Sequence, residues 1–302
     1  MEEKMNKFIC IDIGGTAIKS GILAYDGTVL FSQETPTMAC EGGRALAHRV
    51  QALARDLRSR EPSVCGIAIS TAGVVHSDLA EIIHASDAIP GYTGINYRKE
   101  LESLKLPVEA ENDVNCAGLS EYAAGSARGA ESALILTVGT GIGGCFIQNG
   151  QLLHGHTYAA CEVGYVPLPE GAFQDVASAT ALVKHVGKLK GEPEVLWNGR
   201  RIFEQAAAGD KDCQTAINLL CARLGQGIAS LCFVLNPEVV VLGGGIMAQE
   251  AVLRQPIEAS FAAHAFGLIA RGTRIEFAKH QNAAGMKGAL VHFLTKHPEL
   301  AR

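Results

Sequence analysis

The chain has 302 residues, of which 48% are hydrophobic, and a formal net charge of −5 at neutral pH. A chain of this length and composition can bury a large core, and its size predicts two domains. The slightly acidic charge provides no basic surface for nucleic acid or anionic lipid, so we expect neither as a partner.

Nine cysteines are scattered along the chain without a C-x-x-C pair, which is typical of reduced thiols rather than a disulfide framework. The first residues lead at once into a short apolar segment and do not resemble a signal peptide. The most apolar stretch, residues 228–242, is interrupted by Asn236 and Pro237 and is too short to span a bilayer. We therefore predict a cytoplasmic protein without a membrane segment.

Predicted strands and helices alternate along the chain, which is typical of an α/β fold with helices packed on mostly parallel sheets. In chain order, the pattern predicts a strand at 8–13, a hairpin around Asp26-Gly27, a helix at 44–60, a strand at 64–70, a helix at 97–104, a strand at 108–110 and a helix ending near 125. The second half continues with strands at 133–138 and 144–148, helices at 176–189, 200–207 and 213–235, a strand at 239–242, a helix at 249–263, a strand at 274–277 and a helix at 283–294.

The motif D-I-G-G-T, residues 12–16, directly follows the first predicted strand. Glycines let backbone amides approach a phosphate closely, the threonine hydroxyl adds a donor, and Asp12 at the strand end can hold Mg²⁺ directly or through water. The alternative is a tight hairpin turn in which Gly14 and Gly15 supply positive φ angles.

A second glycine-rich turn, T-V-G-T-G-I-G-G at residues 137–144, also follows a predicted strand. Two such turns, each in a strand, turn, strand unit, can hold a polyphosphate from both sides. Their spacing is neither that of a Walker loop nor that of a Rossmann fingerprint. A third turn, L-G-G-G at 242–245, can admit a flat nucleoside against bare backbone, or can be an ordinary connection between a strand and a helix.

The candidate acid is Asp113, within E-N-D-V-N between a strand and a helix. A carboxylate there can accept the proton of an attacking hydroxyl, while Asn112 and Asn115 offer hydrogen bonds to sugar oxygens. Phosphoryl transfer asks for little more than positioning and charge stabilisation. The alternative is that Asp113 is only the N-cap of the helix.

These motifs, together with C-E-V-G-Y at 161–165, come in the order and at about the spacing found in ROK sugar kinases, which the chain resembles over essentially its whole length. The resemblance implies an α/β, actin-like ATPase (ribonuclease H-like) fold with the active site in the interdomain cleft. One lobe would comprise residues 1–113 and 280–302, and the other 114–279. It also implies a homodimer that transfers the γ-phosphate of MgATP to a hexose-type sugar at the 6-hydroxyl, with glucose, N-acetylmannosamine or a β-glucoside as substrate.

The resemblance also implies roles for single residues, with Asp113 as the general base. Sugar contacts are implied for Asn112, Glu162 and the backbone around Gly73 and Gly141. The phosphates and metal would face Asp12, Gly14, Gly15, Thr16, Thr140 and Gly141, and the adenosine would face Gly244 and Gly245.

Three departures from the family pattern concern the sugar and metal sites. Zinc-binding relatives have a histidine where this chain has Tyr165 and a cysteine-rich run afterwards, whereas residues 166–177 contain no cysteine. Because structural zinc needs about four ligands, we predict no zinc site and expect His154 and His156 to be loop or surface residues. Tyr165 can stack on a sugar or be a packed aromatic. The segment S-T-A-G at 70–73 and Cys161 also differ from the common S-x-P-G and glycine.

Two other functions fit the same resemblance. ROK-type regulators carry a helix-turn-helix segment before the first glycine motif, and Asp12 lies too close to the start for one. A non-catalytic sugar-binding protein would not need Asp113 beside two phosphate turns. A kinase is therefore the expected function.

Overall fold

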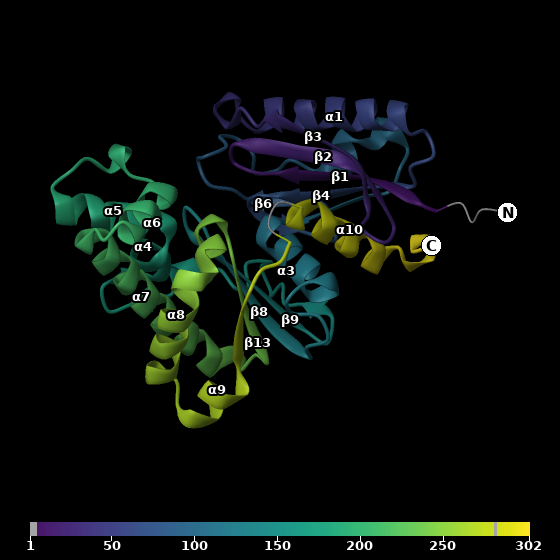
Figure 1. The fold of residues 1–302 in the computed structure, drawn as a ribbon. Coiled ribbons are helices and arrows are strands. Elements are labelled where there is room, and N and C mark those ends of the chain that lie inside the picture. Colours follow the sequence, from purple (N-terminus) through teal and green to yellow (C-terminus); the bar gives the residue numbers. More distant parts are fainter. Residues whose placement is uncertain (1–4, 281–282) are drawn as a thin grey trace. The chain divides into compact units, whose positions relative to one another are not determined.

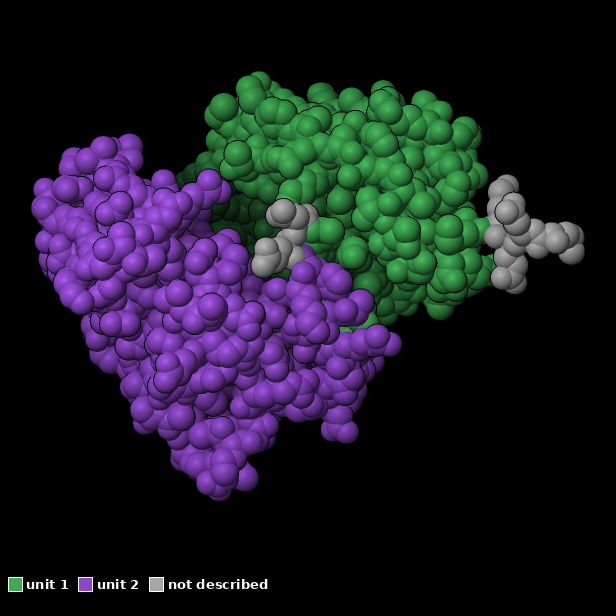
Figure 2. All heavy atoms as spheres, in the orientation of Figure 1, with its two compact units in different colours: residues 1–123, 154–159, 282–302 green, residues 124–153, 160–281 purple. Residues whose placement is uncertain are grey.

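The computed structural model describes residues 5–280 and 283–302. Contacts divide the chain into two units, each described by itself below (Figures 1 and 2). Both units are discontinuous in sequence: unit 1 comprises residues 1–123, 154–159 and 282–302, and unit 2 comprises residues 124–153 and 160–281.

Unit 1 is built on a five-stranded sheet of order β3-β2-β1-β4-β7. Its strands are β1 (Lys7–Ile13), β2 (Ala17–Ala24), β3 (Val29–Pro36), β4 (Gly66–Thr71) and β7 (Val108–Asn112). β1, β4 and β7 are parallel, so their carboxyl ends meet at one edge of the sheet. In this register Asp12 lies opposite Ser70, and Ser70 lies opposite Glu111.

The remaining elements of unit 1 are a short hairpin, four α-helices and short 3-10 turns. They are β5 (Val74–His76), β6 (Glu81–His84), α1 (Gly43–Arg60), α2 (Tyr97–Glu100), α3 (Asp113–Ala124), α10 (Ala284–Lys296), and 3-10 turns at Ala39–Glu41, Glu102–Leu104 and Pro298–Leu300. The single helix expected at 97–104 is therefore wrong in part, because the chain leaves the α-helix at Leu101 and continues as a 3-10 turn that ends at the left-handed Lys105.

The sheet of unit 1 is covered on both faces, which explains why β1 carries apolar side chains on both of its faces. Ile9, Ile11 and Ile13 pack in one cluster with α1, while Phe8 and Cys10 pack in another with α10. Successive side chains of a strand point to opposite faces. Figure 1 shows α1 and α10 on either side of the strands.

Helix α3 packs with unit 1, because its Cys116 belongs to the cluster that includes Phe8 and Phe293. Gly288 of α10 lies so close to the Cys116 backbone that no side chain fits there. The division between the units therefore comes at the end of α3 and not at its first residue, Asp113.

Unit 2 has a second five-stranded sheet, of order β10-β9-β8-β13-β14. Its strands are β8 (Ser132–Val138), β9 (Ile142–Gln148), β10 (Gln151–Leu152), β13 (Val239–Gly243) and β14 (Arg274–Phe277), and a small pair is formed by β11 (Pro167–Leu168) and β12 (Gly171–Ala172). Its helices are α4 (Phe173–Ala177), α5 (Ala179–Lys190), α6 (Gly199–Ala207), α7 (Lys211–Leu235), α8 (Glu250–His264) and α9 (Gly267–Gly272), with 3-10 turns at Val163–Tyr165, Glu194–Leu196 and Gly245–Gln249.

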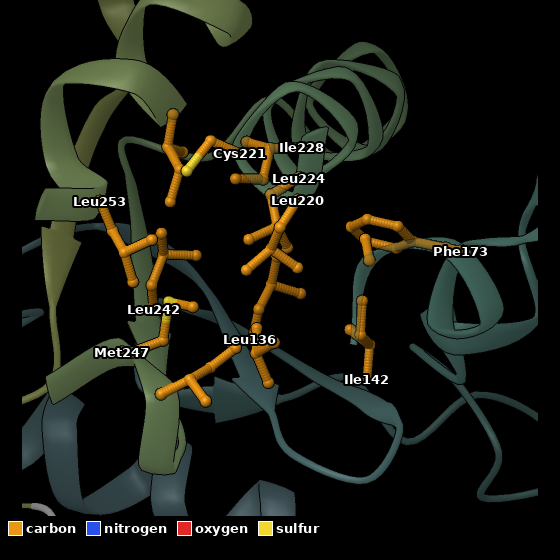
Figure 3. Close-up of a cluster of buried hydrophobic side chains, with 14 of the residues drawn as sticks. Leu136, Ile142, Phe173, Leu220, Cys221, Leu224, Ile228, Leu242, Met247 and Leu253 are labelled. Atoms are coloured by element: carbon orange, nitrogen blue, oxygen red, sulfur yellow. The ribbon is translucent and has the colours of Figure 1, made fainter. Parts of the chain in front are cut away.

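The long helix α7 forms the centre of the unit 2 core, where Leu220, Leu224 and Ile228 lie in one cluster with Leu136 and Leu242 (Figure 3). By length and composition alone α7 could cross a membrane, but 56% of its most apolar window is buried within the protein. The helix ends where the sequence predicts a break, at the left-handed Asn236. It is the core helix of this unit.

Candidate active site

Asp12 lies near the carboxyl end of β1, opposite Lys19 and Ser70 of the neighbouring strands. The Ser70 hydroxyl donates a 2.7 Å hydrogen bond to Asp12 Oδ1, and Gly285 of α10 leaves room for the carboxyl only because it has no side chain. Burial raises the pKa of Asp12, and the Ser70 hydrogen bond and the Lys19 charge offset that rise only in part. Carboxylate oxygens are the ligands that Mg²⁺ prefers.

The first glycine turn joins β1 to β2. The amide of Gly14 donates to the Ala17 carbonyl at 3.0 Å, and the Gly14 carbonyl accepts from the Thr37 hydroxyl at 2.6 Å. Neither Gly14 nor Gly15 has a left-handed φ, so the alternative that these glycines supply positive φ angles is wrong. A Cβ at the exposed Gly15 would meet nothing within 4 Å, which leaves its backbone open to a ligand, beside the exposed Thr16.

Asp113 is the first residue of α3, but its neighbour Asn112 caps the helix. The Asn112 side-chain oxygen accepts from the amides of Val114 at 2.9 Å and Asn115 at 3.1 Å. The Asn112 side-chain nitrogen donates to Asp113 Oδ1 at 3.1 Å, and this oxygen also accepts from the Val114 amide at 3.0 Å. The capping role considered for Asp113 therefore falls mainly to Asn112, which also orients the carboxylate.

Asn112 is also tied to Gly73, whose carbonyl accepts from the same side-chain nitrogen at 2.9 Å. Gly73 has φ 97°, and a Cβ there would come within 2.8 Å of the His84 carbonyl, so glycine is required. With two bonds from its nitrogen and two to its oxygen, Asn112 is fully engaged within unit 1. Asn115 is buried and donates to Glu111, so the expectation that it contacts a sugar is not met in this structure.

The second glycine turn, between β8 and β9, borders a pocket of about 240 Å³ within unit 2. The pocket combines backbone amides, hydroxyls, an ammonium group and carboxyl and amide side chains; it is lined by Thr140, Gly141, Gln174, Asp175, Ser178, Thr180, Ala181 and Lys184. A Cβ at Gly141 or Gly164 would come within 2.8 Å of the Gln174 side-chain oxygen. Gln174 therefore lies against both the glycine turn and the C-E-V-G-Y segment. The sequence does not predict this residue as part of the site.

The third glycine turn follows β13. Gly244 has φ 103°, and a Cβ there would overlap the Val138 backbone of β8, whereas a Cβ at Gly245 would meet nothing within 4 Å. The 3-10 turn that starts at Gly245 leads to Gln249, which lines a pocket of about 710 Å³ within unit 2. Helices α6, α7 and α8 supply the rest of this pocket, namely Arg200, Phe203, Glu204, Ala206, Ala207, Gln214, Ile217, Asn218 and Val252. Its volume is typical of small-molecule sites.

The C-E-V-G-Y segment forms a short 3-10 turn preceded by the exposed Glu162. Tyr165 is 69% exposed, so it is not the packed aromatic considered as the alternative. Cys161 has φ 63°, a left-handed conformation that glycine adopts without steric cost.

The two histidines near this segment lie in a loop, as predicted. His156 is exposed, whereas His154 is partly buried, with Nε2 2.7 Å from Glu111 Oε2. Within residues 5–280 and 283–302, no group of three or more His, Cys, Asp or Glu side chains could hold a metal ion. The zinc-free state itself remains a prediction.

Comparison with known proteins identifies the family. The ROK family model matches residues 8–296. A beta-glucoside kinase from Listeria innocua is 33% identical over 95% of this chain and 97% of its own. The structure of a ROK family protein from Streptococcus pneumoniae in complex with sucrose matches with a TM-score of 0.84 and 32% identity, covering 97% of this chain and 99% of that one.

A ROK family glucokinase from Streptomyces griseus, solved with glucose and AMPPNP, matches with a TM-score of 0.80 and 25% identity, covering 94% of this chain and 98% of that one. The predicted α/β class and actin-like fold are thereby confirmed. The chain belongs to the ROK family.

Proposed function

We propose that this protein transfers the γ-phosphate of MgATP to the 6-hydroxyl of a hexose-type sugar, with Asp113 as the general base. The broader activity, ATP-dependent phosphorylation of a sugar, is that of a ROK-type sugar kinase. The position of Asp113 supports its proposed role as general base, because its carboxylate follows β7 and is oriented by Asn112, which also caps the helix. A primary hydroxyl is the least hindered nucleophile of a hexose.

In the proposed reaction Asp113 accepts the proton of the attacking sugar hydroxyl. The hydroxyl oxygen bonds to the γ-phosphorus of ATP while the bond from this phosphorus to the bridging oxygen breaks, and ADP leaves with that oxygen. Asn112 holds Asp113 Oδ1 during this step. The exposed Glu162 and Tyr165, together with the backbone at Gly73, are proposed as sugar contacts. The Tyr165 ring offers a face on which a pyranose can stack.

For the nucleotide, we propose that the Asp12 carboxylate holds the magnesium ion and that the turn at Gly14, Gly15 and Thr16 contacts phosphate oxygens. We propose phosphate contacts for Thr140 and Gly141 of the second glycine turn as well. The open backbone at Gly15 and the mixture of amides, hydroxyls and Lys184 around the smaller pocket suit phosphate groups.

We place the adenosine at Gly244 and Gly245 and in the larger pocket of unit 2, whose lining includes both apolar and polar side chains. Replacing Ala207 with Trp should obstruct this pocket and raise the KM for ATP by about 10-fold or more, while the KM for the sugar stays the same. Initial rates at varied ATP measure the effect. Ala208→Trp is the matched control, because the neighbouring Ala208 is exposed and does not line the pocket. Equal effects of the two variants would contradict this placement.

A coupled ADP-release assay with MgATP tests the function against glucose, N-acetylmannosamine, N-acetylglucosamine, mannose, fructose, sucrose and cellobiose. Turnover with one sugar identifies the substrate, and NMR of the product shows which hydroxyl carries the phosphate. Sugar binding without turnover on any sugar would instead identify a non-catalytic sugar-binding protein and refute the proposal.

We also propose that the protein lacks zinc. The cysteine-rich run of zinc-binding relatives is missing after Tyr165, and structural zinc needs about four nitrogen or sulfur ligands. Elemental analysis of protein purified without chelators should find far less than one zinc per chain, and dialysis against a chelator should leave the unfolding temperature unchanged. Stoichiometric zinc would refute this proposal.

A cytoplasmic location is proposed because all nine cysteines are free thiols and the reaction consumes ATP. A homodimer is proposed because the resemblance to ROK sugar kinases implies one. Light scattering on the purified protein gives its mass in solution.

A further inference from the structure

The segment 154–159 follows a strand of unit 2 but belongs to unit 1. Its first residue, His154, places Nε2 2.7 Å from Glu111 Oε2. The Glu111 side chain is only 1% exposed, and Glu111 stands two residues before Asp113 at the end of β7. A residue distant in sequence thus touches the strand that leads to the proposed base.

The other carboxylate oxygen of Glu111 organises the start of α3. Its Oε1 accepts from the Asn112 amide at 2.7 Å and from the Asn115 side-chain nitrogen at 3.0 Å. Asn112 in turn holds Asp113 Oδ1. Hydrogen bonds therefore run without a break from His154 through Glu111 and Asn112 to Asp113.

Of the two histidines near Glu111, His154 contributes more than His292 to stabilising the buried Glu111 carboxylate. Burial opposes ionisation of Glu111, yet the hydrogen bond from His154 and the charges of His292 and His154 hold the pKa of Glu111 below its usual value. The hydrogen bond with Glu111 raises the pKa of His154, whereas burial lowers the pKa of His292. His292 Nδ1 lies 3.7 Å from Glu111 Oε2, too far for a good hydrogen bond.

The segment is fixed at its other end by Tyr158. The Tyr158 ring stacks on His76 with centroids 4.1 Å apart, and its hydroxyl donates to Asp78 Oδ2 at 2.9 Å. Lys296 of α10 holds the other oxygen of Asp78 at 3.1 Å. These contacts, all within unit 1, keep His154 in place against Glu111.

We propose that His154 is a positioning residue for the reaction: it holds Glu111, which fixes Asn112 and so sets the direction of the Asp113 carboxylate. The inference rests on the proposed role of Asp113 as general base. His154 touches neither substrate in this scheme, so its removal should affect the chemical step rather than substrate binding.

The test compares His154→Ala, His154→Gln and the exposed neighbour His156→Ala. His154→Ala should lower kcat about 10- to 100-fold, the loss expected for a slightly misplaced catalytic group, with the KM for the sugar within about 3-fold of wild type. His154→Gln keeps a nitrogen donor on a side chain of similar reach and should recover most of the lost kcat. His156→Ala should match the wild type.

Other outcomes separate this inference from the function on which it rests. A wild-type protein without turnover on the sugar panel would refute the proposed function, and this inference with it. An active wild type with an unchanged kcat in His154→Ala, or with a loss confined to KM, would refute the inference alone. If His154→Ala does not fold, His154→Gln provides the test. A folded His154→Gln protein whose kcat stays far below that of the wild type would refute the positioning role.

Discussion

Asp113→Asn is expected to lower kcat by about 100- to 10,000-fold, the range that general base catalysis usually contributes. An amide cannot take the proton of the sugar hydroxyl, but its oxygen can still accept from the Asn112 side chain and the Val114 amide. The first turn of α3 should therefore stay intact. The coupled ADP-release assay measures kcat, and calorimetric titration should give a sugar Kd within about 3-fold of wild type.

The control for this variant is Asp56→Asn, which changes an exposed aspartate of α1 that pairs with Arg60 across one helical turn. Surface pairs of this kind contribute little to stability, so turnover and unfolding temperature should not change. If Asp113→Asn instead weakened sugar binding as much as turnover and lowered the unfolding temperature, Asp113 would be a structural residue at the start of α3.

The sequence predicts those parts of the site that lie at the ends of strands. Every residue of the run Phe8 to Ile13 except Asp12 is apolar, because β1 is buried on both faces. This pattern identifies a central strand and places Asp12 near its carboxyl end. The same reasoning places Asp113 after β7. Parallel pairing then brings Asp12, Ser70 and Glu111 to one edge, as the register shows.

The sequence does not predict how these residues are held. His154 and Glu111 are 43 positions apart, and the segment 154–159 has no periodic pattern that would assign it to a face of an element. Tertiary packing between separate helices and loops likewise places Gln174 beside the second glycine turn and forms the pocket around Ala207. Periodic sequence patterns indicate local structure and do not reveal such contacts.

The sequence also does not show why a glycine is needed at a given position. The motif at Gly14 and Gly15 is compatible with a phosphate turn or with a turn that needs positive φ angles. The backbone angles of the structure rule out the turn with positive φ. At Gly285 no local signal exists, because the reason for glycine is the Asp12 carboxyl of a distant strand. Close approach to another segment explains this glycine, whereas its own position in α10 does not.

Asp12→Asn is expected to remove most of the activity and yet to raise the unfolding temperature near neutral pH. Loss of the carboxylate proposed to hold magnesium should lower kcat/KM by about 100-fold or more. Since burial raises the pKa of Asp12 in the folded protein, the fold loses stability as the pH rises from the ordinary pKa of aspartate to the folded pKa, and the loss is complete above the folded pKa. Asparagine carries no such charge, and its oxygen can still accept from Ser70. Calorimetry without nucleotide or magnesium measures the shift.

The pH dependence of this shift tests its cause. The advantage of Asp12→Asn should be largest at neutral pH and should shrink as the pH falls towards the ordinary range of aspartate, where the wild-type carboxyl also becomes neutral. Ser70→Ala is the matched control, because it removes the hydrogen bond that lowers the pKa of Asp12 and keeps the carboxylate. A lower unfolding temperature for Asp12→Asn at every pH would mean that attraction to Lys19 outweighs the cost of burial. Asp12 would then be an ion-pair partner that stabilises the fold.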